Sequence, residues 1–265
     1  MPRNSSRRSV TTRRSSPPPV QLIPLLGVPE IAAGDDLAAI LCRIAKRGKS
    51  PCRNGDIFVI AQKIVSKSEG SVVDLNSVSP SPKASALAVK LQKDPRFFEV
   101  VLQQSRRIVR EEHVLIVETH HGFVCANAGV DHSNVPGADI VTLLPADPDR
   151  SAAALAESIR KLTGKNIAVI ISDTFGRPWR LGLTNVAIGA AGLAVLLDLR
   201  GGFDRTGKPL QATILAVADE LAAAAGLVMG KAEGIPAVLI RGYRFVPAKD
   251  RASSIIRSAQ EDLFR

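Results

Sequence analysis

The sequence predicts an α+β protein of mixed α/β order, preceded by a disordered basic N-terminal tail. Apolar residues make up 45% and charged residues 23% of the 265-residue chain, which is typical of a globular protein with a substantial core. Short apolar runs alternate with capped helical patterns, but too irregularly for one doubly wound parallel sheet. No apolar run approaches the roughly 20 residues that a membrane-spanning helix needs. We therefore expect a soluble, cytoplasmic protein.

The tail, residues 1–19, contains five arginines and no acidic residue, and it ends in three prolines. This composition cannot bury apolar area, so it predicts disorder. The net charge of +10 is compatible with nucleic-acid binding, but it falls to +5 when these five arginines are removed. Aromatic residues form only 4% of the chain, which leaves little surface for stacking bases. Specific nucleic-acid binding is therefore disfavoured.

The elements of the first half follow from local patterns. Apolar spacing predicts strands and one-faced helices, and Ser81 and Asp94, each directly before a proline, are typical helix caps. In chain order we expect a strand at 20–26, a helix from 35, a strand at 57–61, helices at 83–92 and 96–109, and a hairpin of 114–118 with 123–126.

The second half is predicted in the same way. We expect a helix capped by Ser151 and ending near 162, a strand at 166–172, a strand pair or a strand and short helix over 186–199, a strand at 212–217, a helix at 219–229, a strand at 235–241 and a closing helix at 250–264. This divides the chain into the tail 1–19, a body 20–249 and a C-terminal helix 250–265 packed on the body.

Two aspartates stand at unusual places. Asp173 directly follows the apolar run 168–172, at the end of a predicted strand, where open α/β sheets place ligands. Asp131 lies in a small, turn-forming stretch, 127–134. Each alone is also typical of a capping or turn aspartate. Together, on separate loops, they have the chemistry to hold Mg²⁺ against a triphosphate.

Basic side chains follow other predicted strands. Gln62, Lys63 and Lys67 come just after the strand at 57–61, where lysines either contact phosphate oxygens or form a solvated loop. Arg177 and Arg180 flank the single tryptophan, Trp179, and arginine can bind carboxylates through two hydrogen bonds. We expect these arginines to bind acidic substrates.

Several common sites are excluded. The segment from Gly202 to Lys208 nearly matches a phosphate-binding P-loop, but Pro209 follows, which has neither a hydroxyl nor a backbone N–H. We expect a loop between strands there. The three cysteines and four histidines have no zinc-ligand spacing.

Four blocks, taken together and in order, resemble the coenzyme F-420-0:L-glutamate ligase (F-420:gamma-glutamyl ligase) family. The blocks are Gly55-Asp56 to Glu69-Gly70, Asn127 to Val135, Ser172 to Pro178, and Val217 to Glu220 followed by Met229-Gly230. The likeness extends over roughly 22–243. It implies a family-specific fold, distinct from P-loop and Rossmann domains. It also implies a GTP-hydrolysing ligase that adds glutamate to a deazaflavin phospholactate, two sites for Mg²⁺ or Mn²⁺, a potassium ion and a homodimer.

The resemblance also implies roles for individual residues. Asp131, Asp173 and Lys67 would be catalytic, and Asp131, Asp173 and Thr174 would be metal ligands. GTP would contact Leu26, Gly27, Val28, Pro29, Gln62, Lys63, Lys67, Asn134, Met229, Gly230, Lys231, Ala232, Glu233, Gly234 and Ile235. One departure concerns Lys231, because the archaeal pattern often has an acidic metal ligand directly after Met-Gly. Glu233 or a water molecule would then have to replace that acidic ligand.

Two alternatives remain open from the sequence. The first is a GTP-dependent glutamyl ligase that acts on a different acidic cofactor precursor. The second is a non-catalytic nucleotide- or nucleic-acid-binding protein, for which the basic tail would be the contact.

Overall fold

A five-stranded mixed sheet forms the centre of the computed structural model, which describes residues 18–132 and 137–262. Its strand order is β1 (Gln21–Pro24), β12 (Ala237–Arg241), β2 (Ile57–Ala61), β8 (Ala168–Arg177) and β9 (Arg180–Ala191). Only β2 and β8 are parallel in this sheet. The prediction of an α+β body is confirmed, since a doubly wound sheet would be largely parallel.

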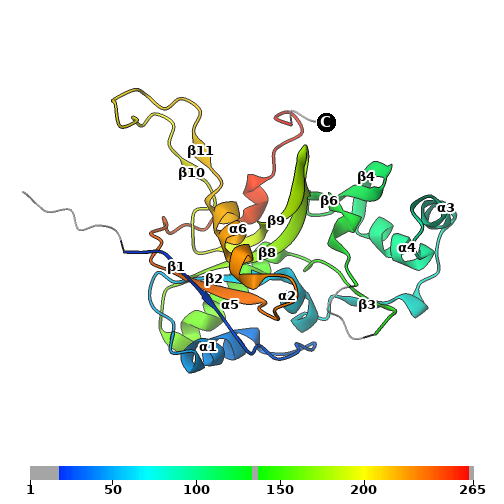
Figure 1. Cartoon of the computed structure of the whole chain (residues 1–265), viewed down its shortest axis with the longest axis horizontal. Coiled ribbons are helices and arrows are strands. Elements are labelled where there is room, and N and C mark those ends of the chain that lie inside the picture. Colours follow the sequence, from blue (N-terminus) through cyan, green and yellow to red (C-terminus); the bar gives the residue numbers. More distant parts are fainter. Residues whose placement is uncertain (1–17, 133–136, 263–265) are drawn as a thin grey trace, which may run out of the picture.

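Helices cover both faces of this sheet, as Figure 1 shows. On one face α1 (Leu37–Arg47) and α5 (Pro148–Thr163) pack against Phe58, Ile60 and Val169, and on the other α6 (Val217–Met229) packs against Ile57 and Val59. Burial on both faces explains why β2 is an unbroken apolar run rather than an alternating one.

A second cluster lies beside the sheet (Figure 1). Helices α3 (Pro82–Leu91) and α4 (Pro95–Gln103) pack on a three-stranded sheet of β4 (Ser105–Glu112), β5 (Val114–Thr119) and β6 (Val124–Ala126). Short strands β3 (Val72–Asp74) and β7 (Ile140–Thr142) pair nearby. The elements β10 (Leu197–Asp198) and β11 (Ile214–Leu215) carry an exposed loop in which the carboxylate of Asp204 accepts hydrogen bonds from Thr206 and Lys208. The predicted loop between strands is confirmed there.

Two predicted helix boundaries are wrong. The helix expected at 96–109 ends at Gln103, because residues from Ser105 onward pair with β5. The helix expected to begin with a Ser151 cap begins earlier, since the Asp147 side chain accepts from the Arg150 N–H and Pro148 occupies the first turn. Short elements at 62–68, 72–74 and 140–142 were not predicted.

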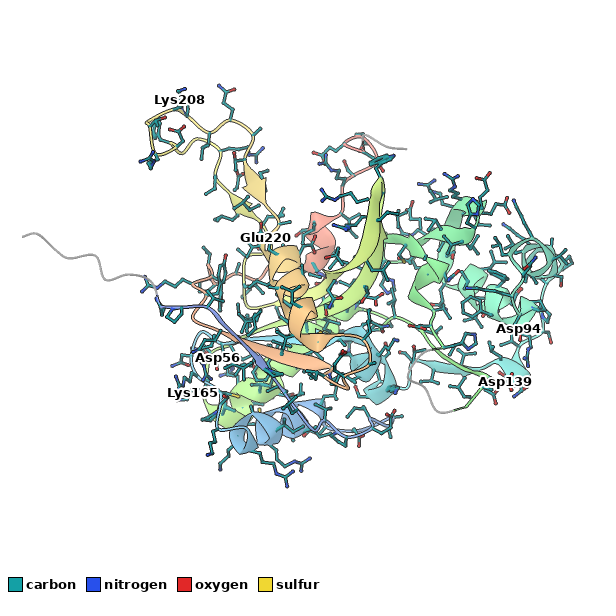
Figure 2. The ribbon with its side chains drawn as sticks, in the orientation of Figure 1. Asp56, Asp94, Asp139, Lys165, Lys208 and Glu220 are labelled. Carbon is teal, nitrogen blue, oxygen red and sulfur yellow. The ribbon has the colours of Figure 1, made fainter. Side chains whose placement is uncertain are left out.

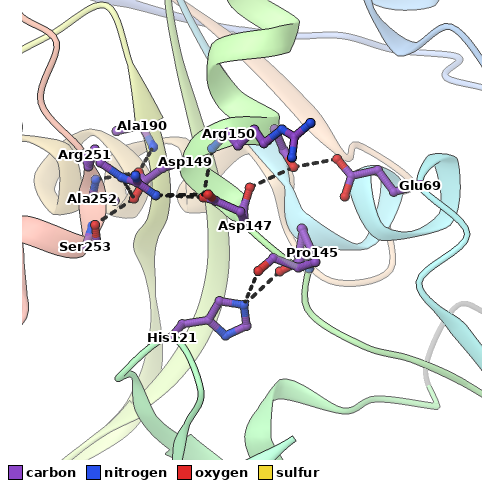
Figure 3. Close-up of polar contacts among 12 residues, drawn as sticks. Glu69, His121, Pro145, Asp147, Asp149, Arg150, Ala190, Arg251, Ala252 and Ser253 are labelled. Atoms are coloured by element: carbon purple, nitrogen blue, oxygen red, sulfur yellow. Dashed lines mark hydrogen bonds and ion pairs between the residues drawn. The ribbon is translucent and has the colours of Figure 1, made fainter.

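The closing helix expected at 250–264 is also wrong, over the part that the structure describes. A single 3₁₀ turn, η3 (Ala252–Ile255), stands in its place. The Ser254 hydroxyl donates to the Arg251 carbonyl, which competes with helical hydrogen bonding. The Asp149 carboxylate accepts from the N–H groups of Ala252, Ser253 and Ala190, so it ties this turn to α5 and β9 (Figure 3).

Candidate active site

A cavity of about 410 Å³ opens where the parallel pairing of β2 and β8 ends. It is lined by segments 28–31, 61–64, 172–174, 229–232 and 234–236, together with Lys67, Asp131, Leu183 and Asn185. Five regions that are distant in sequence therefore meet at one place. Ligand cavities are commonly found at this edge of such sheets.

Asp173 reaches the cavity because of the strand register. The last parallel pair is Ala61 with Ser172, and beyond it the chain of β2 turns into α2 (Gln62–Ser68), so Asp173 has no parallel neighbour. The register of β8 against β9 also shifts between Ile171 and Ser172. Such a β-bulge changes the direction of the side chains that follow it. The sequence placed Asp173 after its strand, whereas β8 continues through Arg177.

Asp131 is held by a rigid backbone. Its N–H donates to the Thr142 carbonyl at 3.1 Å, and the Thr142 N–H donates back at 2.9 Å. The preceding turn has three successive positive φ angles, at Asn127, Ala128 and Gly129. A Cβ atom on Gly129 would lie 2.7 Å from a Leu144 methyl carbon, so only glycine fits that position. This turn directs Asp131 to the cavity.

Helix α2 contributes two lysines, four residues apart and therefore on one helical face. The Lys63 ammonium lies 2.7 Å from Oδ2 of Asp131. The Lys67 side chain is 8% exposed, and its ammonium forms an ion pair with Glu30. Of the two alternatives that the sequence left open for these residues, the solvated loop is wrong, because they form a helix.

The loop after α6 supplies the opposite wall. Gly230 has φ 60° and ψ −152°, and a Cβ atom there would lie 1.9 Å from Oε2 of Glu233. That carboxylate accepts from the N–H groups of Lys231 and Ala232. The Lys231 ammonium donates to the Thr174 hydroxyl at 2.6 Å, and this hydroxyl donates to Oδ1 of Asn185 at 2.9 Å.

The charges in the cavity are balanced and close together. The lining contains Lys63, Lys67 and Lys231 against Glu30, Asp131 and Asp173. The pKa of Asp173 is raised to about 6, mainly by burial and to a smaller extent by the Asp131 charge, while the Thr174 N–H, Lys63 and Lys231 oppose the shift. The direction of this shift indicates that the nearby N–H group and lysines offset only part of the cost of burying the ionised Asp173 carboxylate.

A divalent cation fits the Asp131–Asp173 side of this cavity. Two carboxylates suit Mg²⁺ or Mn²⁺, which complete their coordination with water and phosphate oxygens. Within 18–132 and 137–262, no three His, Cys, Asp or Glu side chains gather around one point, so carboxylates alone do not complete a shell. The hydroxyl of Ser172, the chain neighbour of Asp173, also lines the cavity; it is buried and has no hydrogen-bond partner among the described residues, so it is available to a bound group. The Thr174 side does not fit a cation, since the Lys231 ammonium contacts that hydroxyl.

Most residues singled out in the sequence line the cavity. Leu26, Gly27 and Glu233 do not, and Asn134 lies outside the described residues. Arg177 and Arg180 lie at the turn of the β8–β9 hairpin, away from the lining, and the Arg177 guanidinium donates to the Leu181 carbonyl. These arginines do not line the cavity, and their binding of acidic substrates stays a prediction.

Sequence reasoning missed Glu30, Ser172 and Asn185. Glu30 lies directly after the loop 26–29, and Ser172 directly before Asp173, so proximity to predicted residues was a usable signal for both. Asn185 had no such signal, because only the pairing of β9 with β8 places it opposite Thr174.

Comparison with known proteins agrees with the resemblance drawn from the sequence blocks. The family model described as F420-0:Gamma-glutamyl ligase matches residues 26–242. The chain is 46% identical over 250 residues to the coenzyme F420:L-glutamate ligase of Methanothermobacter thermautotrophicus, covering 93% of this chain and 99% of that protein. It is 46% identical over 244 residues to that of Methanopyrus kandleri (89% and 94%) and 42% over 246 residues to that of Natronomonas pharaonis (90% and 92%). In the described part of the chain, no helix is both long and apolar enough to cross a membrane.

Proposed function

The chain belongs to the F420-0:gamma-glutamyl ligase family, and from this premise we propose that it attaches L-glutamate to the terminal carboxylate of the deazaflavin F420-0 at the expense of GTP. One observation carries the proposal: Asp131 and Asp173, from separate parts of the chain, line one cavity with three lysines. That set suits a nucleotide polyphosphate and a divalent cation better than it suits an uncharged ligand.

The proposed chemistry has two steps. In the first, the acceptor carboxylate attacks the γ-phosphorus of GTP, and the bond to the β-phosphate oxygen breaks, which gives an acyl phosphate and GDP. In the second, the α-amine of glutamate attacks the acyl carbon, phosphate leaves, and the amine loses a proton as the amide forms. Repeated addition through the γ-carboxylate would lengthen the product. Activation is needed because a free carboxylate has a poor leaving group.

We assign roles to this chain's residues as follows. Asp131 and Asp173 hold the divalent cation, which when bound supplies charge neutralisation at the phosphates. The Lys63 and Lys67 ammonium groups bind phosphate oxygens as point charges. Gln62 is buried at the start of α2, and its Oε1 accepts from the Ser66 hydroxyl at 2.8 Å, which orients its amide N–H₂ group for the nucleotide.

The walls of the cavity complete the nucleotide site in this proposal. Val28 and Pro29 from one loop, and 229–232 with 234–236 from the other, supply backbone groups and apolar surface. A potassium ion and a homodimer are further parts of the proposal. Metal analysis after removal and re-addition of potassium tests the ion, and sedimentation equilibrium tests the homodimer.

A reconstitution assay tests the activity. Purified full-length protein is incubated with GTP, Mg²⁺ or Mn²⁺, L-glutamate and F420-0, and products are followed by mass spectrometry. We expect a glutamyl adduct, with GDP and phosphate released in equal amounts. Replacing GTP by ATP tests nucleotide choice, and replacing F420-0 by other acidic cofactor precursors tests acceptor choice.

A matched pair of variants ties the activity to the cavity. Asp131→Asn should reduce ligation to background without changing the circular dichroism spectrum. Asp204→Asn, in the exposed β10–β11 loop, should ligate at the wild-type rate. Wild-type turnover by a folded Asp131→Asn variant would overturn the assignment of Asp131, and salt-sensitive RNA or DNA binding without GDP release would favour a non-catalytic role.

A further inference from the structure

Lys231 places an ammonium group at the α6 side of the cavity. It is the first residue after the Gly230 cap of α6, and its Nζ lies 2.6 Å from the Thr174 hydroxyl. The end of a helix favours a positive charge, because the last carbonyl groups point toward it. Lys231 also lowers the pKa of the Asp173 carboxyl, which indicates that its charge lies near that group.

The loop 229–235 turns no acidic side chain toward the cavity. Glu233 is the only acidic residue in 229–235, and its carboxylate bonds to the N–H groups of Lys231 and Ala232. These hydrogen bonds hold the pKa of Glu233 below its ordinary value. Glu233 is absent from the cavity lining, so it stabilises its own loop rather than offering a ligand.

The Thr174 hydroxyl is already engaged on both sides. It accepts from Lys231 and donates its proton to Asn185, whose side-chain nitrogen in turn contacts the sulfur of Met229. A divalent cation on Thr174 would have to approach the oxygen that the ammonium already contacts. Two cations at such short separation repel each other strongly in a partly buried site.

We propose that Lys231 takes the place of a second divalent cation: the chain binds one, at Asp131 and Asp173, and the Lys231 ammonium contacts the nucleotide's polyphosphate. A lysine supplies a permanent charge without a coordination shell, so phosphate oxygens can bind it directly. The contact with phosphate rests on the proposed function. The number of divalent cations bound per chain, called the cation number below, does not.

A manganese titration tests the cation number. Full-length protein is titrated with Mn²⁺ alone, and the loss of the free Mn²⁺ paramagnetic resonance signal measures the bound ion. We expect one Mn²⁺ per wild-type chain and two for Lys231→Asp, which removes the ammonium and adds a carboxylate beside Thr174. Lys208→Asp is the matched control, since Lys208 lies at the tip of the β10–β11 loop (Figure 2), and it should bind one.

Three results overturn the cation number: two Mn²⁺ ions or none per wild-type chain, or a single ion in a Lys231→Asp variant whose circular dichroism spectrum is native. If that variant does not fold, the wild-type value decides alone. Lys231→Met tests the phosphate contact. It should still bind one Mn²⁺, but it should bind GTP about tenfold more weakly, as expected for the loss of a hydrogen bond to a charged group. Unchanged GTP affinity overturns that contact.

The two proposals fail separately. Protein that binds one Mn²⁺ but forms no glutamyl adduct would reject the ligase reaction and leave the cation number standing. Protein that forms the adduct and binds two Mn²⁺ would reject the role of Lys231 and leave the reaction standing.

Discussion

The ammonium nitrogen of Lys63 lies 2.7 Å from Oδ2 of Asp131, and this ion pair joins helix α2 to the segment that follows the turn 127–129. The two side chains are 22% and 42% exposed, so solvent screens the pair in part. Lys63 also opposes the raised pKa of Asp173. One lysine thus partly neutralises both aspartates, and any cation that binds them competes with it.

Lys63→Met should therefore strengthen cation binding. With the competing ammonium removed, we expect Mn²⁺ affinity to rise by about threefold to tenfold, in line with the ~1 kcal/mol of a partly exposed ion pair. The same resonance titration measures it, with Lys208→Met as control. Weaker Mn²⁺ binding by a folded Lys63→Met variant would show that the lysine supports the cation site instead of competing with it.

Gly230→Ala should damage the loop that forms one wall of the cavity. Its backbone conformation is nearly confined to glycine, which costs about 1–3 kcal/mol for alanine, and the new Cβ would also displace Glu233. We expect a lower free energy of unfolding in urea and a raised KM for GTP. Gly201→Ala is the control: φ is also positive, at 78°, but a Cβ meets no atom within 4 Å, so stability should fall less and KM should not change.

Asp149→Ala should destabilise the fold without touching the cavity. The carboxylate is 6% exposed and accepts from the N–H groups of Ala190 and Ala252 at 2.9 and 2.6 Å (Figure 3). Unsatisfied buried N–H groups cost roughly 1–3 kcal/mol each, so we expect the two to lower the free energy of unfolding in urea by about 2–6 kcal/mol. Asp147→Ala, which removes only a helix cap and a surface ion pair, should lose about 1 kcal/mol. Equal losses for the two variants would contradict this account.

Asp147 should also make stability depend on pH. The Arg150 N–H, with the Arg251 charge, lowers the pKa of Asp147. A lowered folded-state pKa means that the carboxylate stabilises the protein above its ordinary pKa, near 3.9, and that this contribution is lost as pH falls through the folded value. Asp147→Asn preserves the cap but not the charge. The wild type should exceed this variant in stability at pH 7, and the difference should vanish in strong acid. A difference independent of pH would contradict the ionic contribution.

The sequence predicted those elements whose causes are local. The bounds of β2 were predicted correctly at both ends, because a short apolar run preceded by Gly55-Asp56 needs no distant partner to be recognised. The caps of α3 and α4 were likewise predicted from Ser81 and Asp94, whose side chains accept from N–H groups two or three residues ahead. Residues 105–109 were predicted wrongly as helix, since their strand depends on pairing with β5.

The same division holds for the cavity. Sequence blocks alone selected Asp131, Asp173 and the residues around Met229, because these blocks occur in the same order as in the family that they resemble. That Lys63 pairs with Asp131, and that Lys231 contacts Thr174, followed only from the structure. Each contact joins segments separated by many residues, and sheet pairing and helix packing bring them together. Local preferences set where helices and strands form, whereas the packing of the whole chain decides which charges meet.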